Sequence, residues 1–182
     1  MPPERTDLPE QILLARAIQG DADAFGDLYE RYLEEIHRYV FYRVADRSEA
    51  EDLTETAFLK AWEALPRFKS SGVNLRAWLY RIAHNIVVDH YRARKATVDL
   101  YDEQVHDTHP LPEHQTQDRD EQQRLASAIR SLDDLMQQVI VCRFINGMSP
   151  AETAQVLGVK EGYVRVLQLR ALQKLRGLLE KE

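Results

Sequence analysis

The stretch from Ser149 to Arg176 constrains the fold more than any other part of the chain, because it predicts two helices joined by a very short turn. Ser149 and Glu152 have the spacing of a capping box, and Pro150 stands at the first helical position, where a missing N–H costs nothing. Gly158 follows where that helix should end, since a helix end favours a residue that tolerates positive φ. The pattern therefore predicts a short helix that stops at Gly158.

A second, basic helix is predicted after three further residues. Its expected buried positions recur at three- and four-residue intervals with cations between them, namely Val164, Leu167, Ala171, Leu172 and Leu175 among Arg165, Arg170, Lys174 and Arg176. A helix-turn-helix also needs a small residue, a turn glycine and a branched residue in register, and Ala154, Gly158 and Val164 supply them. We expect the second helix to enter a DNA major groove. An antiparallel helical hairpin with solvated cations is the alternative.

An all-α fold is predicted for the whole chain. Hydrophobic residues make up 44% of its 182 residues, which is enough for packed cores, and alternating runs rich in valine, isoleucine and threonine are missing. The single cysteine, Cys142, excludes an internal disulfide. Neither a signal-peptide core nor an apolar run long enough to span a bilayer is found. We therefore expect a cytoplasmic protein without membrane contact of its own.

Charge and periodicity divide the chain into two domains. The formal net charge is −6, yet residues 73–95 carry +4 and residues 122–182 carry +3, so positive charge is concentrated in two helical stretches. Residues 96–121 lose the helical periodicity and carry −7. The prediction is two small helical domains, residues 1–95 and 122–182, joined by a flexible acidic linker, with the helix-turn-helix in the second domain.

Other helix boundaries follow from capping residues and apolar stripes. The expected helices run over residues 9–18, from an Asp21 or Asp23 cap to Val44, from a Ser48 capping box to Leu65, from an Asn74 cap onward, from Gln122, and from Asp133 to Gly147.

The predicted helix after Ser48 has a face that suits a protein interface. Asp52, Glu55, Leu59 and Trp62 recur three or four residues apart and mix acids with a large aromatic side chain. A half-buried tryptophan on a small domain is the alternative.

The predicted helix after Asn74 has a face that suits unpaired DNA. Its outer side carries the cations, amides and acids Arg76, Arg81, His84, Asn85, Asp89, His90, Arg92, Arg94 and Lys95, interleaved with the aromatic residues Trp78, Tyr80 and Tyr91. Phosphates favour the cations, and an unstacked base favours a flat side chain and an amide. We therefore expect this helix and the loop before it to hold single-stranded DNA.

No metal site, cofactor site or catalytic group is predicted. His84 and His90 are six residues apart and point to different sides of a helix, and His106, His109 and His114 fit no compact site. No serine, cysteine or carboxylate pair has a partner arrangement that indicates catalysis, so an enzyme is the disfavoured alternative.

Three pieces in register resemble a known family. SEAEDLTETAFLKAW, NLRAWLYRIAHNIVVDHYRARK and the carboxy-terminal stretch LDDLMQQVIVCRFINGMSPAETAQVLGVKEGYVRVLQLRALQKLR resemble bacterial sigma factors of the extracytoplasmic-function group, in the sigma-seventy family. The resemblance covers nearly everything from Phe25 to Leu179. It implies that the first domain binds the RNA polymerase clamp and the minus-ten promoter element, and that the second binds the minus-thirty-five element and the polymerase flap.

The resemblance also implies residue roles. Asp52, Glu55, Leu59 and Trp62 match the clamp-binding segment. Phe68, Lys69, Ser70 and Ser71 match the loop that captures an extruded minus-ten base, beside Arg81, His84, Asn85, Asp89 and Arg92. The minus-thirty-five positions are Lys160, Tyr163, Arg165, Val166, Arg170 and Lys174.

The chain departs from the family at several of these positions. Relatives often have Gln then Glu at Glu55 and Thr56, Thr at Tyr163, and Ser then a basic residue at Val166 and Leu167, so this recognition helix is unusually apolar. The resemblance further implies control by an anti-sigma protein, the only expected route to a membrane. A conventional helix-turn-helix regulator that binds duplex DNA without polymerase is the remaining alternative.

Overall fold

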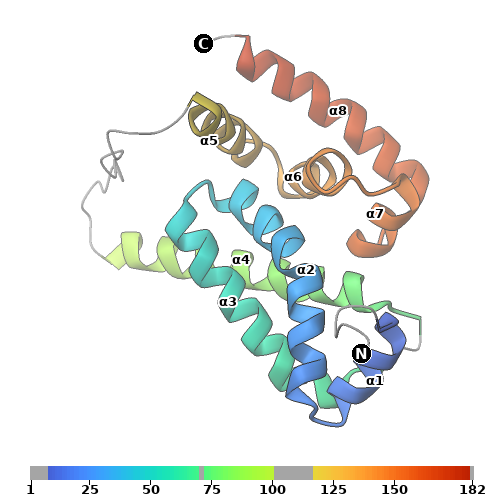
Figure 1. The fold of residues 1–182 in the computed structure, drawn as a ribbon. Helices are drawn as coiled ribbons and strands as arrows, with labels where there is room; N and C mark the ends of the chain where they lie inside the picture. Colours follow the sequence, from blue (N-terminus) through green and yellow to red (C-terminus); the bar gives the residue numbers. More distant parts are fainter. Residues whose placement is uncertain (1–7, 70–71, 101–116, 181–182) are drawn as a thin grey trace.

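The computed structural model describes residues 8–69, 72–100 and 117–180 (Figure 1). Within these ranges the chain forms helices and no strand, which confirms the all-α prediction. They are α1 (Glu10–Ile18), α2 (Ala22–Val44), α3 (Arg47–Ala64), the short 3-10 helix η2 (Leu65–Arg67), α4 (Leu75–Leu100), α5 (Gln117–Arg130), α6 (Asp134–Ile140), the π-helical η3 (Val141–Ile145), α7 (Pro150–Leu157) and α8 (Glu161–Leu179).

The first domain is built around α2, which packs against α1, α3 and α4. Asp21 caps α2 by accepting the Ala24 N–H at 3.1 Å, and Asn74 accepts the Ala77 N–H at 2.8 Å before α4. The Ser48 capping box was wrong: Asp46 caps α3 by accepting the Glu49 N–H at 2.8 Å, which places Ser48 inside the helix. Aspartate caps a helix as well as serine does, so the cap lies at Asp46, two residues earlier than predicted.

The helix-turn-helix has the predicted local geometry. Ser149 Oγ accepts the Glu152 N–H at 3.1 Å, and Glu152 Oε2 accepts the Ser149 N–H at 2.7 Å, so the capping box is complete. Gly158 ends α7 with φ of +67°. Leu172 was predicted to be buried, but it is 40% exposed, because the buried side of α8 is already filled by Val164, Leu167, Ala171 and Leu175.

The helix predicted from Asp133 to Gly147 is interrupted. It is regular only to Ile140, and the Asn146 N–H then donates to the Val141 carbonyl, five residues earlier, at 2.9 Å. Arg143 stabilises this wide turn by donating a hydrogen bond to the Met148 carbonyl. The turn redirects Asn146 toward the first domain, where its side chain is bonded.

The helices extend beyond the predicted linker boundaries. α4 continues to Leu100, and α5 begins at Gln117 rather than Gln122. Asp118 and Asp120 lie in the first turn of α5, where acids interact favourably with the helix dipole. The rest of the predicted linker, residues 101–116, lies outside the described residues.

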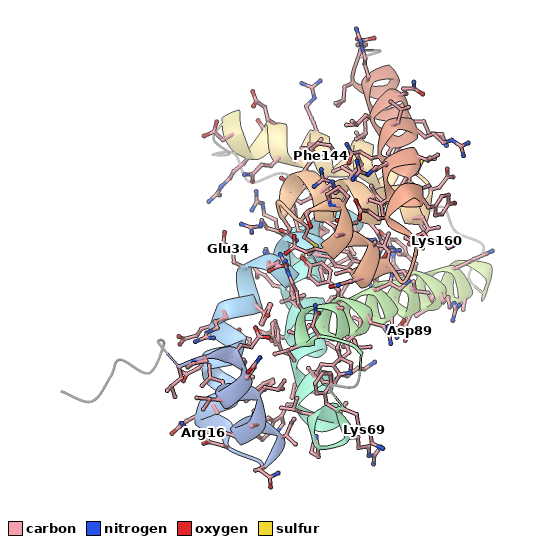
Figure 2. The ribbon with its side chains drawn as sticks, turned by 90° about the vertical axis from the view of Figure 1, so that its right-hand side faces the viewer. Arg16, Glu34, Lys69, Asp89, Phe144 and Lys160 are labelled. Atoms are coloured by element: carbon pink, nitrogen blue, oxygen red, sulfur yellow. The ribbon has the colours of Figure 1, made fainter. Side chains whose placement is uncertain are left out.

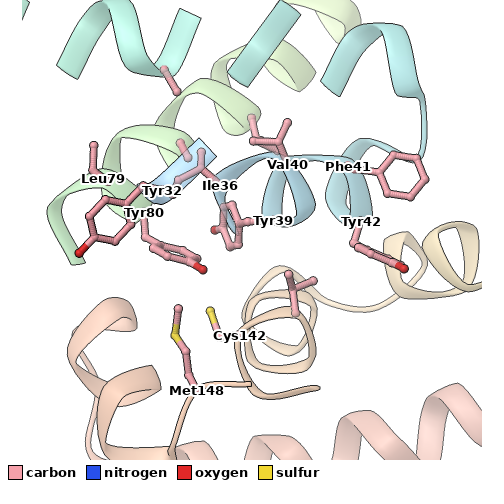
Figure 3. Packing of buried hydrophobic residues seen from close by; sticks show 14 of the residues in the cluster. Tyr32, Ile36, Tyr39, Val40, Phe41, Tyr42, Leu79, Tyr80, Cys142 and Met148 are labelled. Atoms are coloured by element: carbon pink, nitrogen blue, oxygen red, sulfur yellow. The ribbon is translucent and has the colours of Figure 1, made fainter. Parts of the chain in front are cut away.

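The two domains share one hydrophobic core. Tyr39 on α2 and Tyr80 on α4 are fully buried, with ring centroids 4.9 Å apart. Cys142 and Met148 of the second domain face these rings (Figure 3). The second domain therefore packs directly on α2 and α4, which the sequence did not predict. None of the helices in the described ranges is long and apolar enough to cross a membrane.

Candidate functional site

An open apolar hollow lies between α2 and α3. It has a volume of about 440 Å³ and is lined by Ala22, Phe25, Tyr29, Glu55, Phe58, Leu59 and Trp62. Phe25 packs on Trp62 with ring centroids 5.0 Å apart, and Tyr29 meets Phe58 edge-on at 4.7 Å. Leu59 stands at the rim and is 62% exposed. Such a contiguous apolar surface with a large exposed side chain is typical of a protein interface.

Three of the four residues predicted for a protein interface meet in this hollow. Glu55, Leu59 and Trp62 line it, whereas Asp52 is exposed on α3 outside the lining set. Phe25 and Tyr29 were not predicted for this hollow, because they belong to the broad apolar stripe of α2, a pattern that predicts core residues. The width of that apolar stripe was the sequence signal for these two residues. One packing helix can cover only part of so wide a stripe, so the rest stays accessible to a partner.

The start of α4 and the preceding loop place some minus-ten candidates together. Phe68 packs on Trp78 with ring centroids 4.9 Å apart, and Lys69 is exposed beside it. Ser70 and Ser71 lie outside the described residues.

Further along α4, the candidates face two environments. Arg81 and His84 line a cleft of about 280 Å³ whose other wall is the second domain, with Asp134, Leu135, Gln138, Val156, Leu157 and Gly158. Asn85, Asp89 and Arg92 are exposed. Tyr80 was expected on the outer face, but it is only 1% exposed, because the second domain covers that side of the helix.

A buried arginine organises this cleft. The Arg43 side chain is 3% exposed and donates to the Tyr39 hydroxyl at 2.7 Å and to the Asp134 carboxylate. Its Nη1 lies 2.8 Å from His84 Nδ1, which must accept, since a guanidinium has only donors. Burial alone would lower the pKa of Arg43, because it disfavours the charged form. The interactions of the guanidinium with Tyr39 and Asp134 exceed this effect, so the pKa of Arg43 lies above its ordinary value. Burial and then Arg43 hold the pKa of His84 below its ordinary value, against the attraction of Asp134.

The predicted minus-thirty-five residues are exposed along α8 and at its N-cap, but they do not share one face, since Arg165 and Lys174 are nine residues apart and lie on opposite sides of the helix. Lys160, at the helix start in Figure 2, is exposed together with Tyr163, Arg165, Val166, Arg170 and Lys174. Two of the cations are held by acids of their own domain, Arg165 by Glu161 at 2.5 Å and Lys174 by Asp133 at 2.8 Å. Leu169 on α8 is also 60% exposed, so an apolar side chain stands among these exposed positions.

The fold and these surfaces define a class of DNA-binding protein with two helical domains and a carboxy-terminal helix-turn-helix. Two family models match the chain, Sigma-70 region 2 over residues 28–97 and Sigma-70, region 4 over residues 128–177. The chain therefore belongs to the sigma-70 family of RNA polymerase sigma factors, in its extracytoplasmic-function (ECF) group. The members of this family are transcription initiation factors and not enzymes.

Two relatives show how far the similarity extends. The chain is 33% identical to the RNA polymerase sigma factor CnrH of Cupriavidus metallidurans, covering 100% of this chain and 98% of that one. It is 37% identical to the ECF RNA polymerase sigma factor BldN of Streptomyces coelicolor over 92% of its own length, and it spans 64% of the length of BldN.

A solved structure has the same fold. CnrH in complex with the cytosolic domain of CnrY matches with a TM-score of 0.74 and 32% identity, covering 95% of this chain and 98% of that chain. The sigma factor RpoE of Bartonella quintana matches with a TM-score of 0.64 over 85% of this chain and 97% of that one, at 23% identity, which is a likeness of fold.

Proposed function

We propose that the chain binds RNA polymerase core enzyme, directs it to specific promoters and helps to melt the minus-ten region. In this proposal, residues 1–95 bind the polymerase clamp and the minus-ten element. Residues 122–182 bind the minus-thirty-five element and the polymerase flap, and residues 96–121 link the domains. Membership of the sigma-70 family supports the general activity, and the residues below support the particular contacts.

The hollow between α2 and α3 is the proposed clamp contact. The observation that carries it is Leu59, an apolar side chain that is 62% exposed at the rim of a hollow lined by the rings of Phe25, Tyr29, Phe58 and Trp62. Burying such a cluster against a partner removes apolar surface from water and supplies aromatic anchors. The exposed carboxylates of Asp52 and Glu55 lie on the same helix and offer charge pairing at the edge of the contact.

The proposed DNA contacts lie on α4 and α8. Arg81, Asn85 and Arg92 combine cations with an amide on one helix, and Phe68 with Trp78 forms an aromatic pair at its start. On α8, we assign Arg165, Arg170 and Lys174 to contacts with phosphates and base edges, and the exposed Val166 to apolar contact with a thymine methyl group.

In this proposal, α4 and α8 each bind DNA with modest affinity, and core polymerase makes the two contacts act together. Holding both domains on one enzyme converts the second DNA contact into an intramolecular event with a high effective concentration. Trapping an unpaired base in the first domain then offsets the few kcal/mol needed to unstack it.

We further propose that a protein partner regulates the chain in the cytoplasm, where its polymerase operates. CnrH was solved bound to the cytosolic domain of CnrY, and the sequence resemblance implies control by an anti-sigma protein. A segment that occupies the hollow or separates the chain from polymerase would be sufficient for such control.

Capture of core polymerase by the immobilised chain tests the clamp contact. Leu59→Asp places a charge in the hollow, and the matched control Lys60→Asp places the same side chain on the neighbouring exposed position, which does not line it. We expect Leu59→Asp to weaken capture by about tenfold or more and Lys60→Asp to leave it near the wild-type level. Equal capture by both variants would remove the hollow from the proposed interface.

A further inference from the structure

The side of α8 that points away from its own domain is apolar in the first turns of the helix. α5, α6 and α7 all lie on one side of α8 (Figure 1). The positions of α8 that are buried against them are Val164, Leu167, Ala171 and Leu175. Gly162, Val166 and Leu169 follow one another at intervals of four and three residues, which places them on one line along the opposite side. Val166 is 44% exposed and Leu169 is 60% exposed. We call these three residues the α8 stripe.

Two arginines lie on either side of the α8 stripe. Arg165 is on one flank and Arg170 is on the other, each less than about a quarter turn from the line. The Arg165 side chain is 67% exposed, and it pairs with Glu161 at 2.5 Å. The surface is therefore an apolar line between two cations. A DNA major groove has the complementary character, because phosphates border it on both sides and thymine methyl groups lie on its floor.

The α8 stripe has no side chain that can form a hydrogen bond with a base. Direct readout by hydrogen bonds uses arginine, lysine, asparagine, glutamine and similar polar side chains. On this line the first such side chain is Gln173, four residues beyond Leu169. The base feature that an aliphatic side chain recognises is the 5-methyl group of thymine. Leu169 lies about 4.5 Å further along the helix axis than Val166, which is close to the spacing of about 3.4 Å between neighbouring base pairs. The two side chains can therefore reach methyl groups of adjacent base pairs.

Gly162 provides an independent observation on the same line. Glycine within a helix costs stability relative to alanine, so a structural reason for it is expected. A Cβ at Gly162 would meet no atom within 4 Å, and Gly162 is not among the glycines with positive φ. Neither packing nor backbone conformation in the chain itself therefore requires glycine here. The missing side chain does allow another molecule to approach the backbone of the first turn closely.

We propose that α8 recognises a minus-thirty-five element with two adjacent A·T pairs through the 5-methyl groups of their thymines. Val166 and Leu169 contact the methyl groups, and Gly162 is the point of close approach that lets them reach the floor of the groove. The proposal rests on the proposed function. It adds Leu169, Gly162 and the class of DNA sequence to the contact assigned to Val166.

Selection of duplexes by the holoenzyme identifies the element. Core polymerase with the full chain is incubated with a duplex library randomised over both promoter elements, and the retained duplexes are sequenced. We expect A·T pairs at two adjacent positions of the minus-thirty-five element. A selected element without adjacent A·T pairs would overturn this inference and leave the proposed function intact. A holoenzyme that selects no sequence would overturn both.

Replacing single thymines of the selected element by deoxyuridine tests the methyl contacts. Deoxyuridine lacks only the 5-methyl group and keeps every hydrogen-bonding group of thymine. We expect each replacement to weaken holoenzyme binding about fourfold, from about 0.8 kcal/mol for one buried methyl-sized group. Val166→Ala should abolish the difference at one position and Leu169→Ala at its neighbour. The matched control is Leu178→Ala, which shortens a leucine of α8 that lines a hollow with α5, and it should keep both differences.

Two results of this comparison would overturn the inference. One is equal binding of the wild-type holoenzyme to the thymine and deoxyuridine duplexes. The other is an undiminished difference at both positions in Val166→Ala and Leu169→Ala. Reduced capture of core polymerase by Leu169→Ala would make the α8 stripe a protein contact, and it would also count against the inference.

Gly162→Ala tests the close approach. Alanine favours the helix and its Cβ has space, so the variant should resist urea at least as well as the wild type. We expect it nevertheless to weaken holoenzyme binding to the selected element about tenfold or more. Gly177→Ala is the matched control, because a Cβ at this other glycine of α8 also meets no atom within 4 Å, and it should bind the element as the wild type does. Wild-type binding by Gly162→Ala would overturn the assignment of Gly162.

Discussion

The Asn146 amide lies 2.7 Å from the Tyr80 hydroxyl, and these two residues come from different domains. The same hydroxyl donates to Glu35 Oε1 at 2.6 Å, so one buried phenol joins α2, α4 and the turn after η3. Burial raises the pKa of Tyr80 strongly, with Cys142 and Glu35 acting in the same direction, so the phenol stays protonated. The hydrogen bond therefore joins α4, which we propose contacts unpaired DNA, to the domain that contains α8, the other proposed DNA-binding helix.

Replacing Tyr80 by phenylalanine should destabilise the fold. Tyr80→Phe leaves Asn146 and Glu35 each without one buried hydrogen bond, so we expect the free energy of unfolding to fall by about 1–2 kcal/mol. Urea unfolding followed by circular dichroism measures it. The control Tyr163→Phe removes a hydroxyl from a side chain that is 44% exposed, and it should change the stability by less than about 0.5 kcal/mol. Equal losses in the two variants would contradict the role assigned to the Tyr80 hydroxyl.

Acidification should destabilise the chain through His84. Burial, followed by the Arg43 guanidinium, lowers the pKa of folded His84 below its ordinary 6.5, so the unfolded chain binds more protons below that pH. This contribution to stability is complete above pH 6.5 and is lost as the pH falls through the folded pKa. His84→Gln retains an acceptor for Arg43 but cannot be protonated. The difference between the unfolding free energies of the wild type and this variant, measured at each pH, therefore isolates the contribution of His84 protonation. A difference that stays constant from pH 8 to below 6.5 would be incompatible with a lowered pKa of His84.

Removal of a cation from α8 should weaken promoter binding in a salt-dependent way. Arg170 is exposed on the outer face of α8, and we expect Arg170→Ala to lower the affinity of the holoenzyme for promoter DNA and to reduce the slope of log affinity against log salt by about 1. Fluorescence anisotropy over a range of salt concentrations gives both values. Arg119→Ala removes an exposed cation from α5 and is the charge-matched control, so it should keep the wild-type slope. A slope unchanged by Arg170→Ala would take Arg170 out of the phosphate contacts.

Local features were predictable from the sequence, because their determinants lie within a few residues of one another. The Ser149–Glu152 capping box, the positive φ of Gly158 and the Asn74 cap all depend on one turn of chain. The Ser48 cap was wrong because Asp46, two residues earlier, caps the helix instead by accepting the Glu49 N–H.

Features that depend on tertiary packing were not predictable. Arg43 and Asp134 are 91 residues apart, and nothing near Arg43 in the sequence indicates an anionic partner there. In the sequence, Tyr80 is surrounded by cations and amides, a pattern that predicts a base-stacking residue. In the structure the second domain covers it and buries its ring. Phe25 and Tyr29 belong to the proposed clamp contact only because α3 lies along the edge of α2 and leaves their rings open.

The most direct measurement of the central claim is transcription of fragmented genomic DNA by purified core polymerase, with and without the chain, followed by sequencing of the transcript 5′ ends. The account predicts a defined set of start sites that requires the chain, disappears with Leu59→Asp and persists with Lys60→Asp. Start sites that do not change when the chain is added, combined with tight binding of the isolated chain to closed duplex DNA, would contradict it.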